Sequence, residues 1–175
     1  MNEIIKAMKE RRSIRNFKSD MPAKEDLRQI VDAGLYAANA RGKQAVITVA
    51  VTDKKTRDRL SAVNCQIGGW QDGFDPFYGA PAILIVLADK NWPNRVYDGS
   101  LVMGNMMLAA HSLGLGSIWI HRAKEEFEKT EWQKFLADLG VKGEWEGIGH
   151  VAVGYVDGET PVAAPRREDR VFWAE

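Results

Sequence analysis

The stretch that most constrains the fold is the uninterrupted apolar run PAILIVLAD at residues 81–89. Its composition and length predict a strand, and the lack of polar alternation indicates that both of its faces are covered. Such a strand requires a sheet with helices packed on each side. The chain has 175 residues, of which 45% are hydrophobic, and this is enough apolar material for the core of one domain.

Further helical and strand patterns follow one another along the rest of the chain. Helices are expected at 3–10, at 24–39 with Asp20 as a cap-like acid, at 54–64, at 98–114 and at 124–140. Strands are expected at 45–53, 116–121 and 148–156. Because two helices open the chain and the later elements are mixed, the order favours an α+β sandwich with a mixed sheet.

The helix expected at 98–114 carries few charges, and we expect it to be central. Its small residues Gly104, Ala109 and Ala110 allow close packing, including against a second copy of the chain. Gly114 is a plausible residue to end this helix. The Gly-x-Gly of SLGLGS follows a helix and precedes a strand, which is the reverse of a dinucleotide fingerprint. We therefore interpret Gly114 and Gly116 as turn residues, at a place of close backbone approach.

Composition and scattered reactive residues exclude several classes of function. The 24 Lys and Arg balance 24 Asp and Glu, which argues against a dedicated nucleic-acid binder. The single Cys65 cannot form an internal disulfide, and the first residues contain no apolar signal core, so a cytoplasmic location is expected. The three histidines lie far apart and no Gly-x-Ser-x-Gly is present, so neither a metal site nor a side-chain nucleophile is predicted.

Arginines form two clusters, at positions 11, 12 and 15 and at positions 166, 167 and 170. The planar guanidinium donates paired hydrogen bonds to a phosphate, and two clusters could fold around one such group. The alternative is that both clusters are solvated surface charge.

A Gly-rich loop at 65–79 carries Trp70, Phe74, Phe77 and Tyr78. These aromatic side chains either pin the loop to the core or form a wall over a flat ligand.

Four segments in order resemble the nitroreductase family of flavoenzymes. Arg11-Arg12-Ser13-Ile14-Arg15-Asn16-Phe17 matches the family signature Arg-Arg/His-Ser-x-Arg/Lys-x-Phe/Tyr. The other matching segments are the apolar strand at 77–89, the long helix and strand at 98–120, and the last strand and tail from 149 through Arg166 and Arg167. Because most of the chain takes part, the resemblance is much more specific than any single segment.

The resemblance implies a three-layer α/β/α sandwich with a mixed, mostly antiparallel sheet, in an intertwined homodimer with FMN at the interface. Residues 1–175 would form one FMN-binding domain, with 157–175 as an extended C-terminal arm. The cofactor-binding positions that it implies are Arg11, Arg12, Ser13, Arg15, Asn39, Arg41, Gln44, Asn64, Ser117, His121, Arg166 and Arg167. The family pattern is not kept at Ala38-Asn39, Gly42 and Ala45-Val46, so the contacts of this loop differ from the usual ones.

The implied activity is transfer of a hydride from NADH or NADPH through FMN to nitroaromatics, quinones or similar flat acceptors, in a ping-pong mechanism. In that scheme the flavin carries the chemistry and no side chain is catalytic. Arg41 and Lys43 are candidates to stabilise negative charge on the flavin, and Trp70, Phe74, Phe77 and Tyr78 to line the acceptor pocket. The alternatives are a flavin-binding or flavin-remodelling protein of the same fold, a simple phosphate-binding module, and an interaction protein that uses the aromatic loop.

Overall fold

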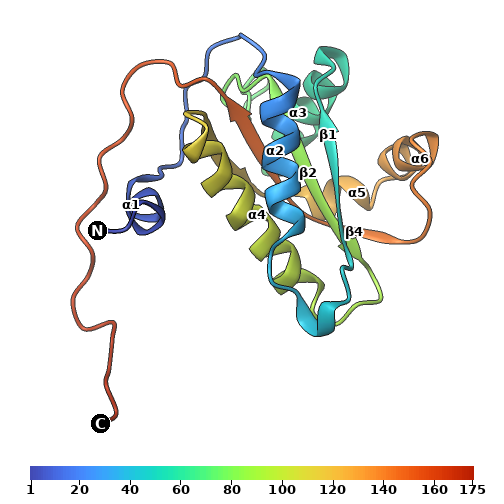
Figure 1. Cartoon of the computed structure of the whole chain (residues 1–175). Helices are drawn as coiled ribbons and strands as arrows, with labels where there is room; N and C mark the ends of the chain where they lie inside the picture. Colours follow the sequence, from blue (N-terminus) through green and yellow to red (C-terminus); the bar gives the residue numbers. More distant parts are fainter.

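The computed structural model describes residues 1–175, which fold into a four-stranded sheet with helices on both faces (Figure 1). The elements, in chain order, are α1 (Glu3–Glu10), α2 (Lys24–Leu35), the 3-10 turn η1 (Ala40–Gly42), β1 (Val46–Val51), α3 (Lys54–Gly68), β2 (Ala82–Asp89), α4 (Arg95–Ser112), β3 (Gly116–Ile120), α5 (Ala123–Phe127), α6 (Thr130–Asp138) and β4 (Trp145–Gly154).

The strand order is β1-β2-β4-β3, and every neighbouring pair is antiparallel. As predicted, β2 lies inside the sheet, and its residues from Ala82 to Ala88 have no exposed surface. Ile83, Ile85 and Leu87 pack into one core, whereas Ala82, Leu84 and Val86 pack into the other. The one parallel contact is the bridge between Ser13 and Ser117, which places the first arginine cluster beside the edge strand β3.

Two helical layers cover the two faces of the sheet. One layer is α2 and α4, which cross the sheet together in Figure 1, and their buried side chains include Ile30, Met103 and Met106. The opposite core takes Leu60 from α3, Phe127 from α5 and Trp132 from α6. These two cores make the chain a three-layer α/β/α sandwich, as the resemblance implies, but the sheet is antiparallel throughout and not mixed.

Four local predictions were wrong. α2 ends at Leu35, four residues before the predicted end at 39. α3 continues to Gly68, four residues beyond the predicted end, and Gly69 ends it in the left-handed region with φ +67°. The helix expected at 124–140 is two helices, because Lys129 is extended and the break lets Trp132 be completely buried. Asp20 does not cap α2, whose N-cap is Ala23 with no side-chain hydrogen bond. The prediction for Gly114 was close: it follows the C-cap Leu113 with φ +75°.

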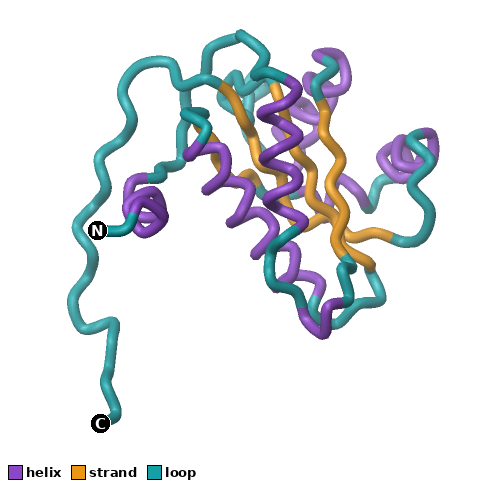
Figure 2. The backbone as a smooth tube through the Cα atoms, in the orientation of Figure 1, coloured by secondary structure: helices purple, strands orange, loops and turns teal.

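The chain after β4 runs alongside the segment that follows α1. The amide of Lys18 donates to Tyr155 O (2.9 Å) and that of Asp157 donates to Asn16 O (3.1 Å). Beyond Asp157 the chain contains no helix or strand. Figures 1 and 2 show that it passes α1 and ends away from the sheet.

Candidate functional site

The segment Arg11–Phe17 is held in place at both of its ends. Asn2 caps α1 by accepting from the amide of Ile4 (2.8 Å), and Arg11 is the C-cap that follows the last helical residue, Glu10. The amide of Ile14 donates to Ser117 O (3.1 Å), while the side chains of Ile14 and Phe17 are buried in the core. The arginine side chains between these anchors therefore start from a fixed backbone.

The first two arginines of the cluster differ in what they bind. Arg12 Nη1 donates to Lys9 O and Arg11 O, both at 2.6 Å, and so satisfies carbonyls at the end of α1. Arg11 is half-buried, and its Nη1 is withdrawn from solvent without a hydrogen-bond partner. Burial, and then the neighbouring charge of Arg12, lower the pKa of Arg11. A buried donor without a partner is costly unless an acceptor joins it, so Arg11 is suited to an anion.

The two arginine clusters meet at one groove of about 870 Å³. Arg11, Arg12, Ser13 and Arg15 line it from the N-terminal side, and Arg166 lines it from the C-terminal arm. Arg167 does not line the groove. The guanidinium of Arg166 donates to Ala164 O (3.0 Å) and remains exposed.

A smaller cavity of about 200 Å³ adjoins this groove at the start of β3, where Arg11, Ser117 and Thr160 contribute to its lining. Gly116 lies at this point because a Cβ there would come within 2.9 Å of side-chain atoms of Ile14 and Val156. Glycine is thus required for the close approach that we predicted at this turn. Ser117 itself is 2% exposed, and it lines this smaller cavity but not the arginine groove.

A second group of predicted residues lies at the other end of α4. Asn39 Oδ1 accepts from the amide of Gln44 (2.9 Å), and the amide of Ala40 donates to Asp98 Oδ1 in the first turn of α4 (3.0 Å). Arg41 and Gln44 are exposed, with φ of +57° and +50°. Since α4 has 18 residues, its ends are about 27 Å apart. Within one chain, therefore, this loop does not meet the arginine groove.

Asn64 is buried inside the chain and does not line the arginine groove. It has no exposed area, and its Nδ2 donates to Glu126 Oε1 (2.7 Å) and to His121 O (2.9 Å). Glu126 in turn lies 2.7 Å from His150 Nε2, and both of these side chains are completely buried. His121, by contrast, is exposed, with its ring 5.7 Å from that of Trp119.

The sequence analysis did not predict the contact between Glu126 and His150. The only signal for it is a single histidine inside the apolar strand pattern IGHVAV, because a polar group in such a position needs a buried partner.

The aromatic loop divides into exposed and buried residues. Trp70 and Phe74 are 39% and 40% exposed, and their ring centroids lie 5.1 Å apart. Phe77 is completely buried against His150, at 5.3 Å between centroids. Phe77 is therefore a core residue and does not line an acceptor pocket, contrary to the prediction. Tyr78 is half-buried with its ring 6.1 Å from that of Phe74.

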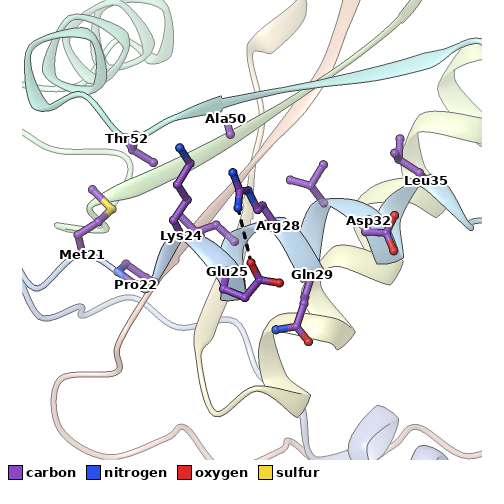
Figure 3. A pocket seen from close by; sticks show the side chains of 12 residues that line it. Met21, Pro22, Lys24, Glu25, Arg28, Gln29, Asp32, Leu35, Ala50 and Thr52 are labelled. Carbon is purple, nitrogen blue, oxygen red and sulfur yellow. Dashed lines mark ion pairs between the residues drawn. The ribbon is translucent and has the colours of Figure 1, made fainter.

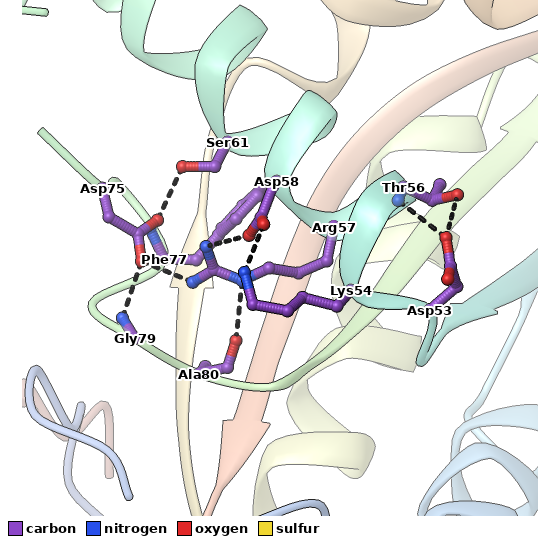
Figure 4. A network of polar contacts seen from close by, with 10 residues as sticks. All are labelled: Asp53, Lys54, Thr56, Arg57, Asp58, Ser61, Asp75, Phe77, Gly79 and Ala80. Atoms are coloured by element: carbon purple, nitrogen blue, oxygen red, sulfur yellow. Dashed lines mark hydrogen bonds and ion pairs between the residues drawn. The ribbon is translucent and has the colours of Figure 1, made fainter. Parts of the chain in front are cut away.

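Asp75 fixes the aromatic loop to α3 (Figure 4). It forms a short ion pair with Arg57 and accepts from Ser61 Oγ (2.7 Å) and from the amide of Gly79 (2.8 Å). Arg57 Nε also donates to Ala80 O (2.9 Å). Burial raises the pKa of Asp75, but the hydrogen bonds from Arg57, Ser61 and Gly79 outweigh it and hold the pKa below the usual value. The loop is thus fixed and is not a free lid.

A third groove, of about 840 Å³, lies between α2 and the edge strand β1 (Figure 3). Leu27 and Val31 contribute apolar surface to it, and Arg28 pairs with Glu25 at its rim (3.7 Å). None of the predicted site residues lines this groove.

The chain contains no group of three or more His, Cys, Asp or Glu residues placed to hold a metal ion. None of its helices has the length and apolar character to cross a bilayer.

Comparison with known proteins gives this geometry a context. The sequence pattern of the nitroreductase family matches residues 8–66 and 70–155. An FMN reductase [NAD(P)H] of Bacillus subtilis is 29% identical over 165 residues, which are 79% of this chain and 64% of that protein. An NADPH-flavin oxidoreductase of Vibrio harveyi is 29% identical over 137 residues, 69% of this chain and 54% of that protein. The chain thus spans less than two thirds of the length of these two curated relatives.

Among solved structures, a nitroreductase with bound FMN from Bacteroides fragilis superimposes with a TM-score of 0.91. It is 25% identical, and the match covers 100% of both chains. The family pattern accounts for most of the sequence, and the fold agrees with it over the whole length. This chain belongs to the nitroreductase family.

Proposed function

We propose that the chain is an FMN-dependent oxidoreductase that takes a hydride from NADH or NADPH and reduces flat acceptors such as nitroaromatics or quinones. The observation that carries this proposal is the half-buried guanidinium of Arg11, whose Nη1 lacks a partner at the arginine groove. A terminal phosphate is the acceptor that a cluster of guanidinium groups fits best. The FMN bound by the Bacteroides fragilis relative has such a phosphate.

The residues of the groove fit the FMN phosphate in charge and chemistry. Arg11, Arg15 and Arg166 would supply the positive charge, and the hydroxyl of Ser13 a further donor. Arg12 would hold the end of α1 rather than the phosphate, because its Nη1 is already used on two carbonyls. When bound, FMN supplies the hydride-accepting ring, while the chain supplies binding, orientation and electrostatic stabilisation. Ping-pong turnover would follow if donor and acceptor occupy the same face of the ring in turn.

A second copy of the chain would complete the site. The loop 39–44 and the arginine groove lie at opposite ends of α4, so one copy cannot bring them together. Two α4 helices packed antiparallel about a two-fold axis would place the loop of one copy near the groove of the other. Asn39, Arg41, Lys43 and Gln44 would then reach the ring of the bound cofactor from the partner, with the two cations stabilising negative charge there.

The exposed face of α4 supports this arrangement. Tyr97 and Leu101 are 72% and 49% exposed, although both are large and apolar. Gly104 lies near the middle of α4 on the exposed side, and a Cβ built there would meet nothing within 4 Å. The residues after Asp157 would form an arm of the single domain 1–175 that wraps the partner, since Val171, Phe172 and Trp173 are 68%, 86% and 82% exposed. A cytoplasmic location stays a prediction from the sequence.

The direct test is spectroscopic. The purified protein should be yellow, should release FMN on denaturation, and should lose its visible flavin absorbance when NADH or NADPH is added without oxygen. Absorbance should return on addition of a quinone. A protein that takes up no FMN would overturn the proposal. Tight FMN binding without NAD(P)H-driven turnover would favour the alternative, a flavin-binding or flavin-remodelling protein of the same fold.

The dimer has its own test in Gly104→Gln. The bulky side chain should separate the two α4 helices while leaving each chain folded, because the position is open in the single chain. Sedimentation should show a dimer for the wild-type protein and a monomer with reduced FMN content for the variant. A variant that remains dimeric with full FMN content would place the interface elsewhere. Lys134→Gln on α6 is the matched surface control.

A further inference from the structure

Arg122, in the turn directly after β3, carries a charge that nothing in the chain neutralises. Its side chain is half-buried, and its guanidinium forms no ion pair and no hydrogen bond with any other group of the chain. Its backbone adopts φ +77°, a conformation that costs free energy for a residue with a Cβ and that is often found at binding sites. The guanidinium of Arg122 therefore keeps its hydrogen-bond donors free for a ligand.

The guanidinium of Arg122 lies over an exposed aromatic surface. Its central carbon is 4.2 Å from the ring centroid of Trp70, which contacts Phe74 in turn. Gly68 beneath them is helical and has no need of positive φ, yet a Cβ there would come within 2.5 Å of the Trp70 ring and 3.0 Å of Arg122 Nε. Glycine at this position is therefore what lets the ring and the cation settle together on the end of α3.

Buried polar side chains contact the backbone carbonyls of the turn that carries Arg122. Asn64 Nδ2 donates to His121 O (2.9 Å), and His150 Nδ1 lies 3.3 Å from Ile120 O. Asn64 and His150 are also both joined to the buried Glu126. The backbone that carries Arg122 is therefore held in place before a ligand binds.

The aromatic side of this surface is equally fixed. Asp75 binds the loop to Arg57 and Ser61 of α3, as Figure 4 shows. A ring stacked on Trp70 or Phe74 would thus meet a rigid wall. A rigid surface lowers the entropic cost of binding a flat ligand.

We propose that Arg122, Trp70 and Phe74 form a subsite for a flat aromatic acceptor that bears a carboxylate. This inference rests on the proposed function and names the substrate class of the same site. The exposed parts of the Trp70 and Phe74 rings receive the aromatic ring of the acceptor. The planar guanidinium of Arg122 has free donors for the carboxylate, which it can bind through two parallel hydrogen bonds. A neutral acceptor of the same shape gains only the stacking.

The test compares 4-nitrobenzoate with 4-nitrobenzamide as acceptors for the FMN-loaded protein. The ratio of their kcat/KM values should fall about tenfold in Arg122→Gln, as expected for the loss of one charge-assisted contact at a half-buried site. Comparing this ratio between proteins cancels the intrinsic difference in reducibility of the two compounds. Unreactive benzoate, used as a competitor, should lose inhibitory strength by a similar factor, whereas benzamide should not.

Lys124→Gln is the matched control, because it removes one exposed cation two residues further along, and its ratio should equal that of the wild type. Equal losses for both acceptors in Arg122→Gln would overturn the proposal and leave Arg122 as a support for Trp70. A change confined to the KM of NADPH would also overturn it, since the cation would then serve the electron donor. Turnover of 4-nitrobenzamide by the wild type tests the proposed function separately: its absence, and not a lack of charge preference, would count against that function.

Discussion

Arg57 is buried and Arg11 is half-buried with its Nη1 withdrawn from solvent, and the two differ in their partners. Arg57 finds its partners within the chain, in Asp75, Ala80 O and the ring of Phe77, 5.5 Å from the guanidinium carbon. Arg11 has a buried Nη1 with no partner and a second cation, Arg12, beside it. The first arrangement stabilises a loop and is complete. The second is incomplete in the free chain, and we take this as the mark of a ligand site.

The largest expected change in unfolding free energy is at Arg57 and Asp75, whose partners all lie within the chain. Asp75→Ala leaves the buried charge of Arg57 without its carboxylate and also removes an acceptor from Ser61 and Gly79. Because Asp75 is 29% exposed, we expect a loss at the lower end of the range for broken buried pairs, about 3 kcal/mol in the free energy of unfolding. Urea denaturation measures it. Asp58→Ala, at a more exposed partner of Arg57, should cost under about 1 kcal/mol; similar costs for the two variants would contradict the account.

The contribution of Asp75 should also depend on pH. Its pKa in the folded chain is lowered, so its stabilisation is fully present above the ordinary aspartate pKa of about 3.9 and is lost as pH falls through the folded pKa. The difference in unfolding free energy between the wild type and Asp75→Ala should therefore shrink from pH 7 to pH 3. Denaturation curves of both proteins at pH 7 and pH 3 measure this change. If the difference in unfolding free energy stays constant, the charge of the carboxylate is not what stabilises the loop.

The smallest expected change in unfolding free energy is at Arg11, whose Nη1 has no partner in the chain. Arg11→Gln should change the unfolding free energy of the FMN-free protein by less than about 0.5 kcal/mol, or raise it, because no partner is lost. The same change at Arg57 should destabilise strongly, since it leaves Asp75 unpaired. If instead Arg11→Gln destabilises the FMN-free protein by more than about 1 kcal/mol, its guanidinium has a structural role.

The sequence predicts the fold well where patterns are long and uniform. β2 and α4 are examples, because the apolar run of β2 is buried on both faces and the weakly charged α4 packs one face against the sheet. The break at Lys129 was not predictable, since it depends on where Trp132 finds space in the core. At the site, the two arginine clusters predict the groove, and the Gly-x-Gly of SLGLGS predicts the close approach at Gly116. The burial of Asn64 and Phe77 depends on Glu126 and His150, which lie far away in the sequence.

The most direct test of the central claim compares FMN with riboflavin, which lacks the phosphate. If the groove of Arg11, Arg15 and Arg166 holds that phosphate, the wild type should bind FMN at least about a hundredfold more tightly, as two charged hydrogen bonds would give. Arg11→Gln should reduce this ratio about tenfold or more while leaving riboflavin affinity unchanged. Equal affinity of the wild-type protein for FMN and riboflavin, measured by fluorescence titration, would contradict the account.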